Sequence, residues 1–204
     1  MTDHITTEES DRKGLRTVRI SWAELLERIG GCEKCGLCQH RNHVVPGEGD
    51  PHARLMFIGE GPGQEEDRQG RPFVGRSGEL LTRMIQAIGM ERTEVYICNV
   101  VKCRPPKNRN PEPDEAAACL NYLRAQVALV RPRVVVLLGK VACQYTLNEQ
   151  VFITRDHGRW YERKGVWFMP TFHPSALLRD PAKKRDAWED FKKIRDKLKE
   201  LSEA

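Results

Sequence analysis

Hydrophobic positions along the middle of the chain follow two alternating patterns, short apolar runs and helical spacings. The run from Arg54 to Gly59 is apolar and ends in glycine, which is typical of a buried strand. Between Ser77 and Ile88 apolar residues recur at helical spacing, so we predict a helix that Ser77 caps and Gly89 ends. The same patterns predict further strands over 95–101, 134–138 and 166–169, and further helices over 114–130, 140–147 and about 181–201.

This alternation of strands and helices predicts an α/β fold, a three-layer α/β/α sandwich with a mostly parallel central sheet. A shorter helix is expected earlier, from Ser21 to Ile29, because Ser21 and Glu24 match a capping box. Residues 1–20 are polar and are expected to form a flexible N-terminal tail. Residues 21–204 are then expected to form a single domain without an internal repeat.

Open sheets of this kind bind ligands at the carboxyl ends of their strands. Three predicted strands are followed there by residues that carry chemistry: Gly59-Glu60-Gly61, Cys98-Asn99 and Phe172-His173. We therefore expect the functional site where these three segments meet.

Charge and cysteine content narrow the class of protein. The net charge of +5 and the pI of about 8.9 permit an anionic partner such as nucleic acid. There is no run of about 18 apolar residues, so we expect no membrane span, and the polar N-terminus lacks the apolar core of a secretion signal. Seven cysteines, an odd number, favour a metal or cluster site over a secreted disulfide framework. We expect a cytoplasmic protein.

Four cysteines are candidate ligands. Cys32 and Cys35 form a C-x2-C knuckle, and Cys103 and Cys119 follow far along the chain. Zinc and a [4Fe–4S] cluster both accept four thiolates, and the spacing does not choose between them. Core packing is the alternative for Cys119, which falls in an Ala-rich helix, and Cys38 extends the knuckle toward a ferredoxin-like run that lacks its fourth cysteine. The remaining two are expected to be small core residues: Cys98 and Cys143.

The glycine-rich segment from Gly59 to Gly63 matches neither a Walker loop nor a Rossmann fingerprint. Backbone N–H groups at Gly61 and Gly63 are candidates for holding an oxyanion or a phosphate, and an ordinary turn is the alternative. Phe73, in the next loop, is expected either to stack on a flat base or to anchor its loop in the core.

Two polar side chains at strand ends are more specific candidates for a role in binding or catalysis. The Asn99 amide has the acceptor and donors to read the edge of a base, and holding a turn is the alternative. His173 is a candidate for donating a hydrogen bond to charge that develops on a leaving group. Leu177, Leu178 and Arg179 are candidates for a wedge that enters the duplex, or else form a surface loop with its leucines packed inward. A basic stretch that either contacts DNA or is simply solvated follows: Lys183, Lys184, Arg185, Lys192 and Lys193.

Together these segments resemble the family 4 uracil-DNA glycosylases, from about Cys32 to the end of the last helix. The resemblance rests on five motifs in the right order: Cys32-x2-Cys35, Gly59-Glu-Gly-Pro-Gly63, Phe73-Val-Gly75, Asn99-Val-Val-Lys-Cys-Arg-Pro-Pro106 and His173-Pro-Ser175. Each motif is weak alone, whereas the ordered set is specific. The resemblance implies a single α/β/α domain with a structural [4Fe–4S] cluster on these ligands: Cys32, Cys35, Cys103 and Cys119.

The resemblance also implies an enzyme of base excision repair. Such an enzyme flips uracil out of single- or double-stranded DNA and hydrolyses its N-glycosidic bond, leaving an abasic site. Phe73 is then expected to stack on the base and Asn99 to contact its O4 and N3–H edge. His173 is expected to face O2 and to stabilise the departing uracil anion. We expect a monomer that is associated with the nucleoid.

The chain departs from other uracil-DNA glycosylases in the group that activates water. Those enzymes carry an acidic or amide side chain at the loop position that Gly61 occupies here. Glu60 and Glu66 are the remaining candidates for a catalytic carboxylate. Our hypothesis is that leaving-group stabilisation supplies more of the rate than base catalysis.

Three other interpretations compete with this one. A related group of proteins becomes covalently attached at the uracil site, but it carries a basic insert near the Phe-Val-Gly motif that the segment 75–88 lacks. A zinc or iron–sulfur DNA-binding module explains the cysteines and the charge, but not the set Phe73, Asn99 and His173. An electron-transfer protein usually has more tightly spaced cluster ligands and needs no basic loops directed at DNA.

Overall fold

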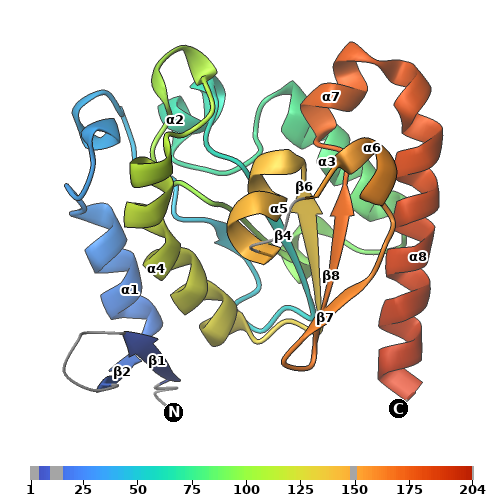
Figure 1. Ribbon diagram of the computed structural model, residues 1–204, viewed down its shortest axis with the longest axis horizontal. Helices are drawn as coiled ribbons and strands as arrows, with labels where there is room; N and C mark the ends of the chain where they lie inside the picture. Colours follow the sequence, from blue (N-terminus) through green and yellow to red (C-terminus); the bar gives the residue numbers. More distant parts are fainter. Residues whose placement is uncertain (1–4, 10–15, 148–150, 204) are drawn as a thin grey trace.

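The computed structural model describes residues 5–9, 16–147 and 151–203, and its centre is a six-stranded sheet (Figure 1). The strands lie in the order β3-β5-β4-β6-β8-β7. Each strand predicted from the apolar runs is present. The bounds are Glu48–Gly49 for β3, Leu55–Gly59 for β4, Tyr96–Asn99 for β5, Val134–Leu138 for β6, Tyr161–Arg163 for β7 and Val166–Thr171 for β8.

The sheet is mixed, which corrects the prediction of a mostly parallel one. Strands β5, β4, β6 and β8 are parallel, and helical crossovers connect them. The short edge strands are antiparallel to their neighbours, β3 to β5 and β7 to β8. Strands β7 and β8 are joined by Lys164 and Gly165, both at positive φ, and a two-residue turn joins only antiparallel strands. Edge strands this short leave little pattern in the sequence.

Helices cover both faces of the sheet, so the predicted three-layer sandwich is confirmed (Figure 1). One face packs against α1 (Trp22–Gly30), α4 (Pro113–Val130) and α5 (Lys140–Leu147). The other face packs against α3 (Arg76–Ala87) and α8 (Lys184–Glu203).

Strand β4 illustrates how one strand supplies two cores. Met56 and Ile58 pack on the side of α1 and α4, whereas Leu55 and Phe57 pack on the side of α3 and α8. All four side chains are completely buried, which is why the sequence shows a continuous apolar run instead of an alternation. Phe57 stacks on Phe191 of α8 with ring centroids 5.9 Å apart, and this contact holds α8 against the sheet.

The predicted helix starts agree with the structure except for the cap of α3 and the start of the last helix, where Pro181–Lys183 form a 3-10 turn and α8 begins at Lys184. Ser21 and Glu24 complete the predicted capping box of α1. In α3, however, Gly75 is the N-cap, and Ser77 lies in the first turn. The carboxylate of Glu66, which lies in the short helix over Gln64–Gln69, accepts the N–H of Gly75 and fixes the chain as it enters α3. A contact with a residue outside the helix, such as this one, leaves no signal in the sequence of the helix itself.

Three short helices lie in segments for which no helix was predicted: α2 (Gln64–Gln69), α6 (Ile153–Asp156) and α7 (Pro174–Arg179). Each is too short to show helical periodicity. The single-turn 3-10 helices are Gly36–Gln39, Arg92–Glu94, Pro106–Asn108 and Pro181–Lys183. None of the helices in the described part of the chain is both long and apolar enough to cross a membrane.

Part of the predicted N-terminal tail has regular structure. Strands β1 (Ile5–Glu9) and β2 (Arg16–Ile20) pair in antiparallel fashion, so these segments are not irregular. Residues 1–4 and 10–15 of the predicted tail lie outside the described residues. The flexibility of the tail and its division from a single domain stay predictions.

Candidate active site

A pocket of about 780 Å³ opens where β4, β5, β6 and β8 end. The glycine-rich loop after β4, the last residue of β5 and the first turn of α7 all border it, as the sequence predicted. Eight of the predicted site residues line this pocket: Glu60, Gly61, Gly63, Glu66, Phe73, Asn99, His173 and Arg179. Segments that are far apart in the sequence therefore form one site.

Asn99 presents an unsatisfied acceptor to this pocket. The residue is 1% exposed, and its Oδ1 has no hydrogen-bond partner among the described residues. A buried polar atom without a partner costs about 1–3 kcal/mol. A ligand that brings an N–H or O–H donor into the pocket recovers that cost, so the Asn99 amide is built to receive a donor.

Phe73 is held close above the end of β4. Its backbone has a φ of +49°, which is unusual for a residue other than glycine, and its side chain is nearly buried. A Cβ atom at Gly59 would lie 2.6 Å from Cζ of Phe73 and closer still to Oδ1 of Asn99. Only glycine at position 59 allows both side chains to approach the pocket floor together.

His173 is the N-cap of α7 and faces the pocket from the end of β8. Its Nδ1 accepts the backbone N–H of Ser175 at 3.1 Å, and the ring centroid lies 5.6 Å from that of Phe73. Burial, and secondarily the positive charge of Arg179, lower the pKa of His173 to about 4. Because Nδ1 is the acceptor, the neutral ring carries its proton on Nε2, which is then free to donate.

Glu66 clamps two loops together, a structural role beside the catalytic role for which it was a candidate. Its Oε1 accepts the N–H groups of Val74 and Gly75, each at 3.0 Å, and its Oε2 accepts the N–H of Gly63 at 3.1 Å. The carboxylate thus fixes the loop that carries Phe73 and has both oxygens engaged. The N–H of Gly63 is engaged as well, so it is not free for a substrate oxyanion.

Glu60 is the better candidate for an acidic group that acts on water. It lines the pocket, it is half-buried, and its carboxylate has no hydrogen bond to any described residue. Burial raises the pKa of Glu60, which makes its carboxylate a stronger base. At the neighbouring Gly61, a Cβ would lie 2.7 Å from Cγ2 of Val101, so a side chain there requires Val101 to move.

Only two of the three residues predicted to form a wedge reach the surface. Leu177 is 1% exposed and packs with Phe172 and Ala187, so it belongs to the core and the wedge prediction is wrong for this residue. Leu178 is half-buried and Arg179 is exposed. For these two residues the prediction stands untested. The short helix α7 turns Leu177 toward the core. A helix of six residues is too short for its sequence to show which of its sides faces inward.

Three exposed cations line the pocket without an ion-pair partner among the described residues: Arg76, Lys140 and Arg179. They are suited to bind phosphates around the pocket mouth. The sequence analysis missed Arg76 and Lys140. A signal existed for Lys140, because it follows Gly139 directly after the predicted strand 134–138, as the other site segments follow theirs.

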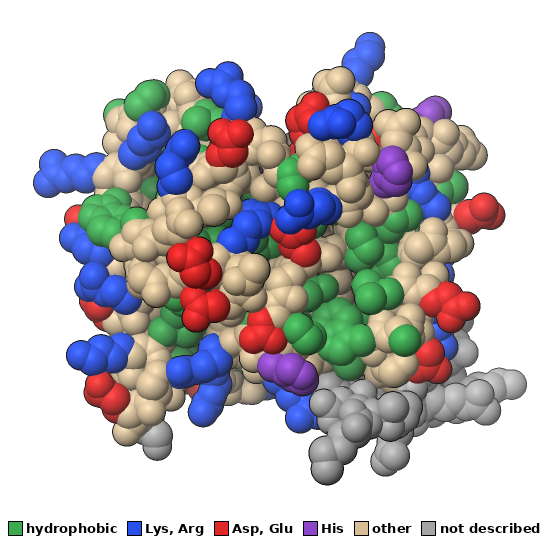
Figure 2. All heavy atoms as spheres, turned by 180° about the vertical axis from the view of Figure 1, so that it is seen from behind, with side chains coloured by type: hydrophobic (Ala, Val, Ile, Leu, Met, Phe, Trp, Pro, Cys, Tyr) green, Lys and Arg blue, Asp and Glu red, His purple; other side chains and the backbone are tan. Residues whose placement is uncertain are grey.

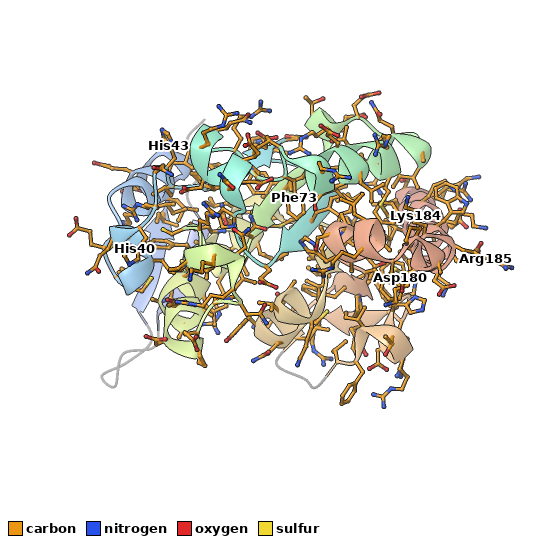
Figure 3. All side chains as sticks on the ribbon, turned by 90° about the horizontal axis from the view of Figure 1, so that it is seen from above. His40, His43, Phe73, Asp180, Lys184 and Arg185 are labelled. Atoms are coloured by element: carbon orange, nitrogen blue, oxygen red, sulfur yellow. The ribbon has the colours of Figure 1, made fainter. Side chains whose placement is uncertain are left out.

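The basic stretch before and within α8 is less directed at the pocket. Lys183 borders the pocket but pairs with Asp180, and Lys192 pairs with Glu189. Figure 3 shows Phe73 near the middle of the molecule and Arg185 at the periphery, pointing away. On the face of the molecule that Figure 2 shows, basic and acidic side chains are interspersed.

The four predicted ligand cysteines line one hollow together with Cys38. None of the described residues that line this hollow is a carboxylate, and Nη1 of Arg41 donates to Sγ of Cys103 at 3.2 Å. Within the described ranges, no group of three or more His, Cys, Asp or Glu side chains is arranged to hold a single metal ion. The hollow is nevertheless a soft donor set from three separate segments. The two cysteines predicted to lie in the core are completely buried: Cys98 and Cys143.

Comparison with known proteins agrees with this arrangement. Residues 46–195 match the family model of the uracil DNA glycosylase superfamily. The type-4 uracil-DNA glycosylase of Sulfurisphaera tokodaii is 46% identical over 185 residues, covering 86% of this chain and 84% of the relative. The type-4 enzyme of Thermotoga maritima is 47% identical over 179 residues (85% and 92%), and that of Archaeoglobus fulgidus 42% over 179 residues (84% and 90%). The chain therefore belongs to the uracil-DNA glycosylase superfamily.

The clamp assigned to Glu66 is tested by Glu66→Gln. The glutamine has one acceptor oxygen, and its amide donor would face a backbone N–H. We expect unfolding to become easier by about 1.5–3 kcal/mol, with uracil release slowed through a displaced Phe73. Denaturant unfolding and single-turnover cleavage measure the two effects. Glu162→Gln, on the exposed edge strand β7, should change neither. Abolished cleavage at unchanged stability would instead assign Glu66 to water activation.

Proposed function

We propose that this protein excises uracil from DNA, as a hydrolase of N-glycosyl bonds that acts in base excision repair and leaves an abasic site. Its membership of the uracil-DNA glycosylase superfamily supports this function. The observation that carries the proposal is the buried, unpartnered Oδ1 of Asn99, which faces a pocket beside Phe73 and His173. By its similarity to the named relatives, we assign the enzyme to type 4.

Uracil reaches the pocket by rotation out of the base stack, which costs least in single strands and mismatches. Arg76, Lys140 and Arg179 bind the flanking phosphates, an interaction that weakens with salt. Phe73 stacks on the base. The Asn99 Oδ1 accepts uracil N3–H, and its amide N–H donates to O4. Cytosine offers an acceptor at N3 and a donor at its amino group, so it leaves the Asn99 amide unpaired.

His173 stabilises the leaving group. The neutral imidazole donates from Nε2 to O2 of uracil, where negative charge grows as the glycosidic bond breaks. The ring does not need to give up its proton, because a hydrogen bond to the anion is sufficient. The backbone N–H of Ser175 holds the ring in this orientation.

Water completes the hydrolysis by attacking the oxocarbenium-like sugar. Glu60 is the residue that orients this water and accepts its proton, since Glu66 is engaged in the clamp. The ionised Glu60 carboxylate also favours the positive charge that develops on the sugar. Leaving-group stabilisation by His173 remains the larger contribution in this mechanism.

The cysteine hollow fits a [4Fe–4S] cluster, with Cys32, Cys35, Cys103 and Cys119 as the ligands. When bound, the cluster supplies a structural cross-link and no redox step. The ligands come from the knuckle after α1, the loop after β5 and helix α4, so the cross-link joins three segments. We further propose that the protein acts as a monomer on single- or double-stranded DNA and is associated with the nucleoid in the cytoplasm.

The central test is uracil release from a labelled oligonucleotide that holds one uracil, followed by alkali and a denaturing gel. We expect His173→Ala and Asn99→Ala each to lower the single-turnover rate by about 10²–10³-fold, the usual effect of removing one donor to a developing anion or one base-reading group. Ser202→Ala, at the far end of α8, is the control and should cleave like the wild type. Absence of cleavage by folded wild-type protein would refute the proposed function.

The pH dependence follows from the lowered pKa of His173. With a pKa of about 4, the ring is neutral above about pH 5, and the neutral form is lost as the pH falls through 4. We expect a flat rate from about pH 5.5 to 8 in Glu60→Gln, which removes the titration of the pocket carboxylate. Single-turnover rates at constant ionic strength measure this. A change in the rate near pH 6.5, the usual pKa of histidine, would contradict the lowered pKa of His173.

The cluster assignment is tested by analysis of iron and sulfide. We expect about four of each per chain, with broad visible absorbance. Cys35→Ser should lose the colour and most of the bound iron, whereas Cys38→Ser, in the same hollow, should keep both. Zinc without iron in the wild type would contradict the cluster, and loss of colour in Cys38→Ser would make Cys38 a ligand.

A further inference from the structure

Lys102 is a lysine in an unusual environment. It is 1% exposed, in the segment that connects the end of β5 to Cys103, and it forms no ion pair with any described residue. A buried ammonium group without a neighbouring negative charge is costly. Methionine would fill a similar space without that cost, so the position requires either the charge of the lysine or its donors.

Two hydrogen bonds hold the ammonium group. Its Nζ donates to the carbonyl oxygen of Asn99 at 2.6 Å and to Oε1 of Gln126 at 2.5 Å. The Gln126 amide is itself oriented, because its Nε2 donates to the carbonyl oxygen of Pro46 and to the hydroxyl of Tyr96. Helix α4 therefore presents a fixed acceptor, and Lys102 connects this acceptor to the end of β5.

The hydrogen bond to Asn99 is one of several that fix the backbone of residues 99–102. The N–H of Val100 donates to the carbonyl of Gly59 at 2.9 Å, and the N–H of Val101 donates to the carbonyl of Glu60 at 3.2 Å. Lys102 then bonds back to the carbonyl of the residue whose Oδ1 faces the pocket. With its carbonyl fixed, the backbone of Asn99 cannot rotate freely, so its side chain is confined to the buried position above Gly59.

On its other side Lys102 borders the cysteine hollow. It lines the same hollow as the four candidate ligands, and Cys103 follows it in the chain. Among the described residues, no carboxylate lines this hollow. The ammonium group is therefore held by its two hydrogen bonds to neutral oxygens, the Asn99 carbonyl and Oε1 of Gln126.

We propose that Lys102 is a positioning residue for uracil recognition, which holds the Asn99 carbonyl and thereby the orientation of the Asn99 amide in the pocket. The proposal rests on the proposed function, because the orientation of Asn99 matters only if this side chain reads a base.

The test compares Lys102→Met with the wild type and with Lys199→Met, a matched control on the exposed surface of α8. Three quantities are measured on the full chain. They are the visible absorbance per chain, the affinity for DNA with an abasic-site analogue, and the affinity for the same DNA with a non-cleavable 2′-fluorodeoxyuridine. The abasic analogue reports phosphate and backbone binding, whereas the difference between the two DNAs reports recognition of the base.

We expect Lys102→Met to keep its absorbance and its abasic-site affinity within about twofold of the wild type. Its preference for the uracil analogue should fall about tenfold, the size expected for one misplaced buried hydrogen bond. Lys199→Met should match the wild type in all three measurements. A parallel loss of all three in Lys102→Met would mean that Lys102 only supports the fold, and an unchanged preference would also overturn the proposal.

If Lys102→Met does not fold, Gln126→Met replaces it, since this change removes the second acceptor of Lys102. The same selective loss of base preference is expected there, and a parallel loss overturns the proposal. The proposed function is judged separately, by the wild type alone. A wild type without preference for the uracil analogue, and without uracil release, refutes the function before any variant is considered.

Discussion

The pocket depends on the close approach of Phe73 and Asn99 over the backbone of Gly59, where no Cβ atom fits. This contact explains why β4 must end in glycine and why Phe73 accepts an unusual backbone conformation with a φ of +49°. A strained conformation persists only where surrounding contacts hold it. Glu66 provides these contacts, since its carboxylate binds the two N–H groups that follow Phe73 and one N–H of the glycine-rich loop.

Much of the fold and part of the site could be predicted from the sequence, because buried strands and long helices leave regular patterns. The run ending at Gly59 and the helix over 114–130 show this, and the strand-end rule placed Asn99 and His173 in one pocket. Contacts between segments leave no such pattern. The clamp at Glu66 and the burial of Lys102 depend on which loops meet, and the inward turn of Leu177 depends on a helix of six residues.

The pocket and the cysteine hollow are mechanically connected through short paths. One path is the segment from Asn99 to Cys103, which passes from the pocket floor to the hollow within four residues. A second path runs through Asp67 of α2, which is 1% exposed and accepts the N–H of Asn42 at 2.9 Å. Asn42 follows Arg41, which contacts Cys103. Both loops that shape the pocket are thus joined to the hollow by chain segments and contacts of only a few residues.

Helix α8 starts beside the pocket, next to Lys183. It ends near the opposite ends of the strands, where Arg54, just before β4, donates a hydrogen bond to Ser202 (Figure 1). Its 20 residues span about 30 Å, at 1.5 Å for each residue. One helix therefore reaches from the pocket end of the strands to their opposite ends. Because Phe191 of this helix packs on Phe57 of β4, the helix also acts as a rigid support along the strand that ends at the pocket floor.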